Sequence, residues 1–225
     1  MCKNLVEKGN LSAPLILYNR TQKRSDELAA KLGSDKTKVA TTIKEAVEPA
    51  DIIFTCVGDD KAIDETIDTI LKSDVKGKLI VDCSTVHPNT TDALSKAVTE
   101  KGAHFVACPV FGAPAMAENG QLICVLAGPK ADVEVVKPYT KGVMGRDFID
   151  YSDQAPGTAL KLKIIGNTFV LQMVEALSEG HVLAEKSGLG SENLHSFIEK
   201  MFPGPYTAYS TRMIKNDHMR DEVRY

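Results

Sequence analysis

Residues 157–188 read GTALKLKIIGNTFVLQMVEALSEGHVLAEKSG. When this stretch is drawn as a helix, apolar side chains occur on nearly every side, and a helix that is apolar all round is normally buried. Gly188 is a suitable residue to end such a helix, because glycine adopts the left-handed backbone conformation common at helix C-termini. The stretch therefore predicts one long, buried helix from Gly157 to Gly188.

Two polar residues stand near the start of this helix. Lys163 and Asn167 are four residues apart, so they share one face. Between them lies Gly166, which costs a helix interior about 1 kcal/mol relative to alanine. Two interpretations stay open from the helix alone. The face is a ligand site, or Lys163 extends to solvent while Asn167 caps a neighbouring element.

The composition is that of an ordinary globular protein. Of 225 residues, 43% are hydrophobic and 25% charged, and the net charge of −3 does not favour nucleic acid or an anionic membrane surface as a partner. The sequence shows no apolar run long enough to span a membrane and no signal peptide. Neither the five cysteines nor the five histidines show metal-ligand spacing, so we expect no metal, and the unpaired cysteine pattern favours the cytoplasm.

Upstream of the long helix, short apolar runs alternate with amphipathic helical patterns. This alternation is typical of an α/β fold, a doubly wound and mostly parallel sheet with helices on both faces. We expect a domain boundary near Ser152, with an α/β domain over 1–152 and an all-helical domain over 153–225. The expected strands are 13–18, 39–41, 51–57, 78–83, 104–108, 121–127 and 147–151, and the expected helices are 1–8, 21–32, 43–48, 60–71, 88–101 and 131–141.

The motif LILYNRT, residues 15–21, places Asn19, Arg20 and Thr21 at the end of a strand. In a doubly wound nucleotide-binding domain, the end of the second strand meets the adenosine ribose. An acid there binds the 2′-hydroxyl, whereas an arginine and a hydroxyl would hold a 2′-phosphate by charge-assisted hydrogen bonds. Arg20 is equally well explained as a solvated loop residue.

Two further motifs follow strands of the same sheet. In DCSTVHP, residues 82–88, Ser84 and Thr85 offer hydroxyls at the carboxyl edge where ligands bind in such folds. The alternative is that they only begin the helix ahead of Pro88. The stretch FVACPVFGAPAMAENGQLICVLAG, residues 105–128, combines a Pro-Val turn, Gly112, a loop of small residues and another strand.

In this order and spacing, the four stretches resemble the β-hydroxyacid dehydrogenase family. That family includes 3-hydroxyisobutyrate dehydrogenase, tartronate semialdehyde reductase and the glyoxylate/succinic semialdehyde reductases. The resemblance extends over essentially the whole chain, and is specific for the family but weak for the substrate. It implies a dinucleotide-binding domain followed by a helical domain, joined by a long helix that carries a catalytic lysine with asparagine four residues later. Lys163 and Asn167 match that pattern.

The resemblance also implies the substrate-side roles. Lys163 would exchange a proton with the substrate oxygen as general acid/base, which suits an ammonium whose pKa is lowered by burial. Asn167 would orient the substrate, a small carboxylate. Ser84 and Thr85 would lie beside the nicotinamide and the substrate carboxylate, and Gly112 would let backbone donors approach that carboxylate.

On the cofactor side, the resemblance implies contacts at the ends of two strands. Val57 and Gly58 would contact the cofactor ribose, and Thr85 would lie by the nicotinamide. Asn19, Arg20 and Thr21 would meet the adenosine ribose. Because Arg20 stands there instead of an acid, we expect NADP rather than NAD.

Three departures from the family pattern concern the substrate. The usual aspartate before the Pro-Val turn is Ala107, and the usual Ser-Gly-Gly is Phe111-Gly112-Ala113. The position three after the lysine, often asparagine or histidine, is Gly166. These changes place the ordinary small hydroxyacid substrates in question. The retained Lys163 argues against an imine reductase, a related class that generally lacks this lysine.

The resemblance further implies that the chain is truncated at both ends. In the family, a first strand and a GxGxxG loop precede the segment that matches residues 1–8. That strand would be central, between those expected at 13–18 and 51–57. The family's helical domain also continues past Tyr225, so we expect the Rossmann-like domain to lack its first strand and the helical domain to be incomplete.

Two classes of function remain open. One is an NADP-dependent oxidoreductase that interconverts a small hydroxy acid and its aldehyde or oxo acid, which Lys163 and Asn167 favour. The other is a non-catalytic relative kept as a binding or dimerisation module, which the lack of a glycine-rich loop favours. In either case the apolar long helix predicts a homo-oligomer.

Overall fold

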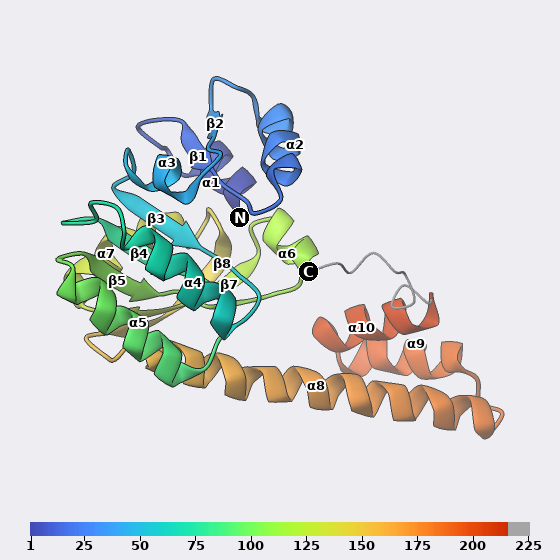
Figure 1. Ribbon diagram of the computed structural model, residues 1–225. Helices are drawn as coiled ribbons and strands as arrows, with labels where there is room; N and C mark the ends of the chain where they lie inside the picture. Colours follow the sequence, from blue (N-terminus) through green and yellow to red (C-terminus); the bar gives the residue numbers. More distant parts are fainter. Residues whose placement is uncertain (216–225) are drawn as a thin grey trace. The chain divides into compact units, whose positions relative to one another are not determined.

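The computed structural model describes residues 1–215 (Figure 1). These described residues divide into two compact units, unit 1 over 1–163 and unit 2 from residue 164 onward. Expected structure at 216–225 lies outside the described residues. The expected boundary was near Ser152, whereas the division falls inside a helix, after Lys163. The first turns of that helix belong to unit 1 because Ala159 and Leu160 are fully buried in its core.

Strands and helices alternate through unit 1, as the apolar runs predict. Its strands are β1 (Leu15–Leu17), β2 (Thr37–Val39), β3 (Ile52–Thr55), β4 (Leu79–Asp82), β5 (His104–Ala107), β6 (Val110–Phe111), β7 (Leu122–Gly128) and β8 (Gly145–Ser152). Its helices are α1 (Cys2–Lys8), α2 (Gln22–Leu32), α3 (Ile43–Val47), α4 (Asp60–Ile70), α5 (Pro88–Glu100), α6 (Pro114–Glu118), α7 (Lys130–Val136) and the start of α8 (Gly157–Lys186).

These strands form two sheets. Strands β1 and β2 pair in parallel, and the second sheet has the order β3-β4-β5-β7-β6, with β8 beside β7. Pairing is parallel from β3 to β5 and between β7 and β8, whereas β7 runs antiparallel to β5 and β6. Within residues 1–215, no strand joins β1 to β3 in a common sheet. The architecture is a Rossmann-like α/β fold with mostly parallel strands.

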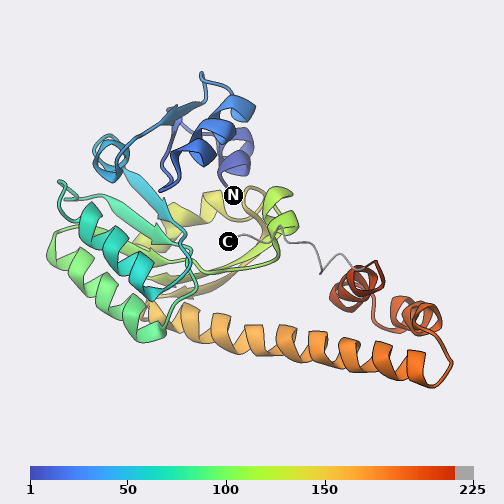
Figure 2. The ribbon, with the colours of Figure 1, turned by 45° about the vertical axis from the view of Figure 1, so that its right-hand side comes forward.

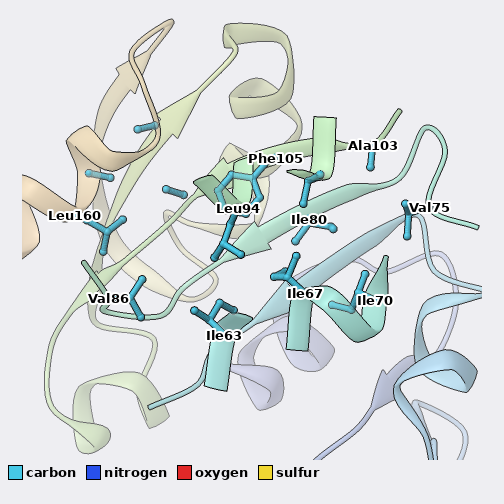
Figure 3. Packing of buried hydrophobic residues seen from close by; sticks show 14 of the residues in the cluster. Ile63, Ile67, Ile70, Val75, Ile80, Val86, Leu94, Ala103, Phe105 and Leu160 are labelled. Carbon is cyan, nitrogen blue, oxygen red and sulfur yellow. The ribbon is translucent and has the colours of Figure 1, made fainter. Parts of the chain in front are cut away.

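Helices cover both faces of the larger sheet. Ile80 on β4 packs with Ile63 and Ile67 of α4 and with Leu94 of α5, a cluster that Figure 3 shows from close by. The next residue, Val81, points to the opposite face, where it joins the cluster that includes α1 and α7. Figure 2 shows α4 and α5 lying against the sheet.

The sequence-based elements differ from the structure in the segment 105–141. Strand β6 and helix α6 were not expected, because Pro109 and the small residues after Phe111 indicated a loop. The helix expected over 131–141 ends as α7 at Val136 and continues as a 3₁₀ turn, Lys137–Tyr139. Pro138 explains this change, since proline lacks the N–H donor and its ring disfavours a continuing α-helix.

Unit 2 contains the rest of α8 together with α9 (Ser191–Met201) and α10 (Pro205–Ile214). Met173 and Leu177 of α8 pack with Ile198 of α9 in its small core. The prediction that the long helix is buried all round is wrong, because Phe169 is 70% exposed and Leu171 is 68% exposed. Among the described residues, no helix is both long and apolar enough to cross a membrane.

Candidate functional site

A buried carboxyl group joins the ends of β3 and β4. Asp82, the last residue of β4, is 1% exposed. Its Oδ1 accepts hydrogen bonds from Thr55 Oγ1 at 2.8 Å, from Ser84 Oγ at 2.7 Å and from Ser84 N at 3.1 Å. Because Thr55 ends β3, this network fixes the two strand ends relative to each other.

The Ser84 hydroxyl forms hydrogen bonds both as a donor and as an acceptor within this network. It donates its proton to Asp82 and accepts a hydrogen bond from Val57 N at 2.9 Å. Ser84 is buried, whereas Thr85 next to it is exposed. The serine expected beside the substrate therefore links the loops after β3 and β4, and Thr85 presents its side chain to solvent.

Burial favours the neutral form of Asp82. Desolvation raises the pKa of this carboxyl, and the hydrogen bonds from Ser84 and Thr55 oppose that rise. Its second oxygen, Oδ2, is buried and has no hydrogen-bond partner within the described part of the chain. The network is thus a polar element in an otherwise apolar sheet.

The loop after β3 leaves room for a ligand. A Cβ added at Gly58 would meet no atom within 4 Å, and Gly58 is exposed. Val57 beside it is half-buried against the core that includes α4 and α5. Gly58 and Thr85 are therefore open positions at the carboxyl edge of the sheet, where ligands bind in folds of this class.

The start of α8 is fixed on α5. Gly157 N donates to Asp92 Oδ1 at 2.7 Å, and a Cβ at Gly157 would lie 2.7 Å from the Pro88 carbonyl oxygen. Only glycine allows this close approach without displacing α5. The contact, together with buried Ala159 and Leu160, sets the direction in which the following residues of unit 1 project.

Lys163 and Lys161 differ in environment. Lys163 is 9% exposed, and its Nζ lies 4.4 Å from the centre of the Phe111 ring, whereas Lys161 is exposed. Desolvation lowers the pKa of the Lys163 ammonium. Lys163, the lysine identified from the sequence, is therefore buried and has a lowered pKa, two properties that suit a proton-transferring amine.

Gly112 follows Phe111 in a conformation that other residues avoid. Its φ is +140°, and a Cβ there would lie 2.7 Å from Leu122 Cδ2 and 3.1 Å from Met116 Cβ. A side chain at this position would therefore be strained and would displace β7 or α6. The local packing explains why the chain has glycine here, whether or not a ligand approaches it.

The remaining expected site residues lie on other elements. Asn19, Arg20 and Thr21 follow β1 and are all exposed. Asn19 Oδ1 accepts a hydrogen bond from Thr21 N at 2.9 Å, which forms the turn into α2. Asn167 is half-buried on the part of α8 that belongs to unit 2.

A second buried polar cluster, in unit 2, was not expected from the sequence. Ser210 on α10 is fully buried, and its Oγ hydrogen-bonds with His181 Nε2 at 2.9 Å and with His195 Nδ1 at 2.8 Å. His195 Nε2 also lies 3.3 Å from Glu199 Oε1. Within residues 1–215, no group of three or more His, Cys, Asp or Glu side chains could hold a metal ion.

Comparison with known proteins gives the family. The sequence model of a protein family, described as the NAD binding domain of 6-phosphogluconate dehydrogenase, matches residues 1–151. These residues contain the whole Asp82 network. The NADH-dependent oxidoreductase ucdB of Aspergillus ustus is 35% identical over 218 residues, which cover 96% of this chain and 73% of that protein. Glyoxylate/succinic semialdehyde reductase 1 of Arabidopsis thaliana is 34% identical over 202 residues, covering 88% and 66% of the two chains.

A solved structure supports the fold. The structure described as Psf3 in complex with NADP+ and 2-OPP superposes with a TM-score of 0.82 over 96% of this chain and 74% of that one, at 20% identity. The strand ends described above lie within residues 1–151, which the family model of an NAD binding domain matches. The chain therefore belongs to the NAD(P)-binding hydroxyacid dehydrogenase family, related to 6-phosphogluconate dehydrogenase, and is an oxidoreductase.

Proposed function

We propose that the protein interconverts a small hydroxy acid and its aldehyde or oxo acid, with NADP as hydride carrier and Lys163 as general acid/base. The observation that carries the proposal is the buried Lys163 ammonium, 9% exposed, on a helix whose start is anchored to the nucleotide-binding domain. Residues 1–152 are the proposed dinucleotide-binding domain, and residues 153–225 belong to the proposed helical domain.

The residues present fit a nicotinamide nucleotide at two places. Gly58 and Thr85 are open positions at the strand ends, and Asn19, Arg20 and Thr21 are exposed after β1. When bound, the nucleotide supplies or accepts the hydride. Val57 would contact its ribose through the loop that Ser84 holds in place. Ser84 and Gly112 would shape the substrate carboxylate site, and Asn167 would orient the substrate.

Lys163 would move the proton. During carbonyl reduction the ammonium gives a proton to the substrate oxygen, and during oxidation the neutral amine takes it back. Because desolvation lowers the pKa of Lys163, the neutral amine is available at a lower pH than for an exposed lysine. Reduction should therefore slow as pH rises through that lowered pKa, while oxidation should speed up.

The test compares two lysines on the same helix. Lys163→Ala should lower kcat by roughly 10²–10⁴, the usual contribution of a positioned acid or base, with little change in NADPH affinity. Lys161→Ala, the matched control, removes an exposed lysine two residues away and should leave turnover nearly intact. Asn167→Ala should mainly raise KM. Equal, small losses at both lysines would reject the catalytic assignment and favour a non-catalytic binding or dimerisation module.

For the cofactor we propose NADP over NAD, because Arg20 and Thr21 stand where an acid would bind a 2′-hydroxyl. A charged hydrogen bond to the 2′-phosphate contributes about 1.5–3 kcal/mol. Arg20→Asp should then weaken NADPH binding and spare NADH. The relative ucdB is named NADH-dependent, so tighter NADH binding by the unmutated protein is the result that would overturn this preference.

We also propose that the protein is a homo-oligomer in the cytoplasm. Large apolar side chains are exposed on unit 2, among them Phe169, Leu183 and Met201 at 60–70%. Exposed apolar surface of this kind marks an interface. All five cysteines are free thiols, which suits a reducing compartment. Light scattering that shows a stable monomer at micromolar concentration would count against the assembly.

A further inference from the structure

The hydrogen-bond ladder between β3 and β4 ends at a side chain. These strands pair in parallel and lie side by side in the sheet (Figure 1), and Cys83 N donates to the Thr55 carbonyl oxygen at 2.8 Å. A continuing parallel ladder would next join Val57 N to the Cys83 carbonyl oxygen. Val57 N donates to Ser84 Oγ instead, at 2.9 Å. The Ser84 hydroxyl therefore takes the place of a backbone carbonyl group and sets where the chain leaves β3.

Asp82 makes this arrangement possible because it accepts the Ser84 proton. A hydroxyl has one proton to donate and lone pairs with which to accept, whereas a backbone N–H can only donate. Ser84 Oγ can accept from Val57 N only while its own proton points elsewhere, and Asp82 Oδ1 receives that proton at 2.7 Å. Ser84 is 1% exposed, so bulk water cannot replace this acceptor. Asp82 therefore fixes the direction of the Ser84 hydroxyl.

The same carboxyl oxygen holds the end of β3. Besides the Ser84 hydroxyl, Asp82 Oδ1 accepts hydrogen bonds from Thr55 Oγ1 at 2.8 Å and from Ser84 N at 3.1 Å. Burial raises the pKa of the Asp82 carboxyl, which favours the neutral acid. The network therefore requires an acceptor oxygen at this position rather than a negative charge.

Each loop residue that this network holds is followed by an open position. Gly58 comes after Val57 and Thr85 comes after Ser84, and both Gly58 and Thr85 are exposed. Because peptide units are planar and consecutive Cα atoms are a fixed distance apart, movement of Val57 or Ser84 moves these neighbours as well. The spacing between Gly58 and Thr85 thus depends on the hydrogen bonds that Asp82 accepts.

We propose that Asp82 is a positioning residue of the nucleotide site. It fixes the spacing between Gly58 and Thr85, the open positions that would meet the ribose and the nicotinamide of the cofactor, without touching either group. This inference rests on the proposed oxidoreductase function and adds to it a residue buried behind the site. A misplacement of about 1 Å can cost about 10²-fold in rate, so a residue that acts only through its neighbours can have a large effect.

The first experiment measures which half of the cofactor loses affinity. Isothermal titration calorimetry with the full chain compares NADPH with 2′,5′-ADP, which carries the adenosine half alone. Asp82→Leu removes the acceptor and keeps most of the volume, so the Kd for NADPH should rise about tenfold. The Kd for 2′,5′-ADP should stay unchanged, because that half would lie beside residues 19–21, after β1 in the other sheet. Asp82→Asn keeps an acceptor oxygen and should bind NADPH nearly as the unmutated protein does.

The positioning role is overturned by an unchanged Kd for NADPH in Asp82→Leu, by an equal rise for both probes, or by an equal loss in Asp82→Asn. Circular dichroism shows whether Asp82→Leu folds, and Thr55→Val replaces it if it does not, because that variant removes only one donor. Thr37→Val is its matched control, since Thr37 is another buried strand threonine whose hydroxyl donates one hydrogen bond at 2.8 Å, to the Gly33 carbonyl oxygen. Thr55→Val should raise the Kd for NADPH and Thr37→Val should not, and equal effects would reject the role.

A second experiment needs no nucleotide. Amide hydrogen exchange followed by NMR compares the Val57 N–H with the Leu79 N–H, which donates to the Asp51 carbonyl oxygen at 2.9 Å at the other end of the same strand pair. In Asp82→Leu, Val57 should exchange about tenfold faster, as expected for the loss of one hydrogen bond, and Leu79 should change less. In Asp82→Asn neither rate should change. Equal acceleration at both amides would show a general loss of stability and would reject the positioning role.

The two experiments separate the failures. If the unmutated protein binds neither NADPH nor 2′,5′-ADP, and neither NADH nor ADP in their place, the proposed function fails. The exchange rates of Val57 and Leu79 then still decide whether Asp82 fixes the loop after β3. If the unmutated protein binds the nucleotide and the Val57 rate is the same in Asp82→Leu, the proposed function stands and the positioning role is wrong.

Discussion

Units 1 and 2 each bury a polar network, and the two differ in chemistry. In unit 1, Asp82 accepts hydrogen bonds from Thr55 and Ser84 at the edge of a sheet. In unit 2, Ser210 lies between His181 and His195 and connects three helices. Asp82 Oδ2 and His181 Nδ1 are both buried without a hydrogen-bond partner among the described residues. One network is built on an acid and the other on imidazoles.

Burial shifts the two titratable groups in opposite directions. Desolvation raises the pKa of Asp82, with the bonds from Ser84 and Thr55 opposing it. Desolvation and the neighbouring His195 lower the pKa of His181, with Glu185 and Glu192 opposing them. Both shifts favour the neutral side chain, as expected where water is excluded. We therefore expect acid to weaken the helical unit and base to weaken the network around Asp82.

The largest loss of stability should come from removing the Asp82 carboxyl group. Asp82→Ala leaves the Thr55 hydroxyl and the Ser84 amide buried without an acceptor, so it should destabilise unit 1 by roughly 2–3 kcal/mol. Asp82→Asn keeps an oxygen acceptor without a charge and should be close to neutral. Hydrogen-exchange mass spectrometry, read separately on peptides of each unit, measures both changes. Asp64→Ala, which removes an exposed aspartate, is the control.

This comparison fails if Asp82→Ala and Asp82→Asn lower protection equally, because the loss would then come from the missing charge rather than from the missing acceptor. It also fails if the loss of protection spreads evenly to α9 and α10. That outcome would mean that the two units unfold together.

A smaller loss is expected in unit 2. Ser210→Ala removes the hydroxyl shared by two imidazoles and should cost about 1–2 kcal/mol, seen as faster exchange in α9 and α10. His195 keeps its contact with Glu199, so one partner remains for that ring. Ser178→Ala on α8 is the matched control, since Ser178 is exposed and donates its hydroxyl proton to the Val174 carbonyl oxygen of the same helix. Equal costs for the two serines would show that the buried cluster contributes no stability of its own.

Much of the fold could be predicted from local patterns. The apolar runs at Leu15–Leu17 and Ile52–Thr55 form strands, and helices α1 and α2 end at Lys8 and Leu32 as expected, each followed by a glycine. The sequence did not reveal that β7 runs antiparallel to β5, because strand direction depends on how the 112–121 connection turns. Exposure of Phe169 was missed because periodicity cannot say whether an apolar face has a partner in the same chain.

The sequence suggested candidate site residues, but it did not show which of them contact one another. Lys163 and Ser84 were found from local motifs, yet the pairing of Ser84 with Asp82 and of Lys163 with Phe111 depends on tertiary packing. Thr55 and Asp82 are 27 residues apart, and Ser210 is 15 and 29 residues from its two histidines. No sequence spacing signals such contacts, so both buried networks appear only once the chain is folded.

The smallest predicted effect is the pH dependence that distinguishes the two networks. Because the folded-state pKa of His181 is lowered, its contribution to stability is present above the ordinary histidine pKa of 6.5 and is lost as pH falls through the folded value. For Asp82 the folded-state pKa is raised, so its contribution to stability is present below the ordinary aspartate pKa of 3.8 and is lost as pH rises through the folded value.

Between pH 7.5 and 5, exchange protection should therefore fall in unit 2 and not in unit 1. His181→Gln should abolish most of that fall, whereas His104→Gln, at a half-exposed ring paired with Asp132, should not. The expected change is smaller than that from Ser210→Ala, because protonating one imidazole leaves the serine hydroxyl in place for the other. A fall of equal size in both units, or one that His181→Gln leaves intact, would show that the acid response belongs to surface charges rather than to this buried ring.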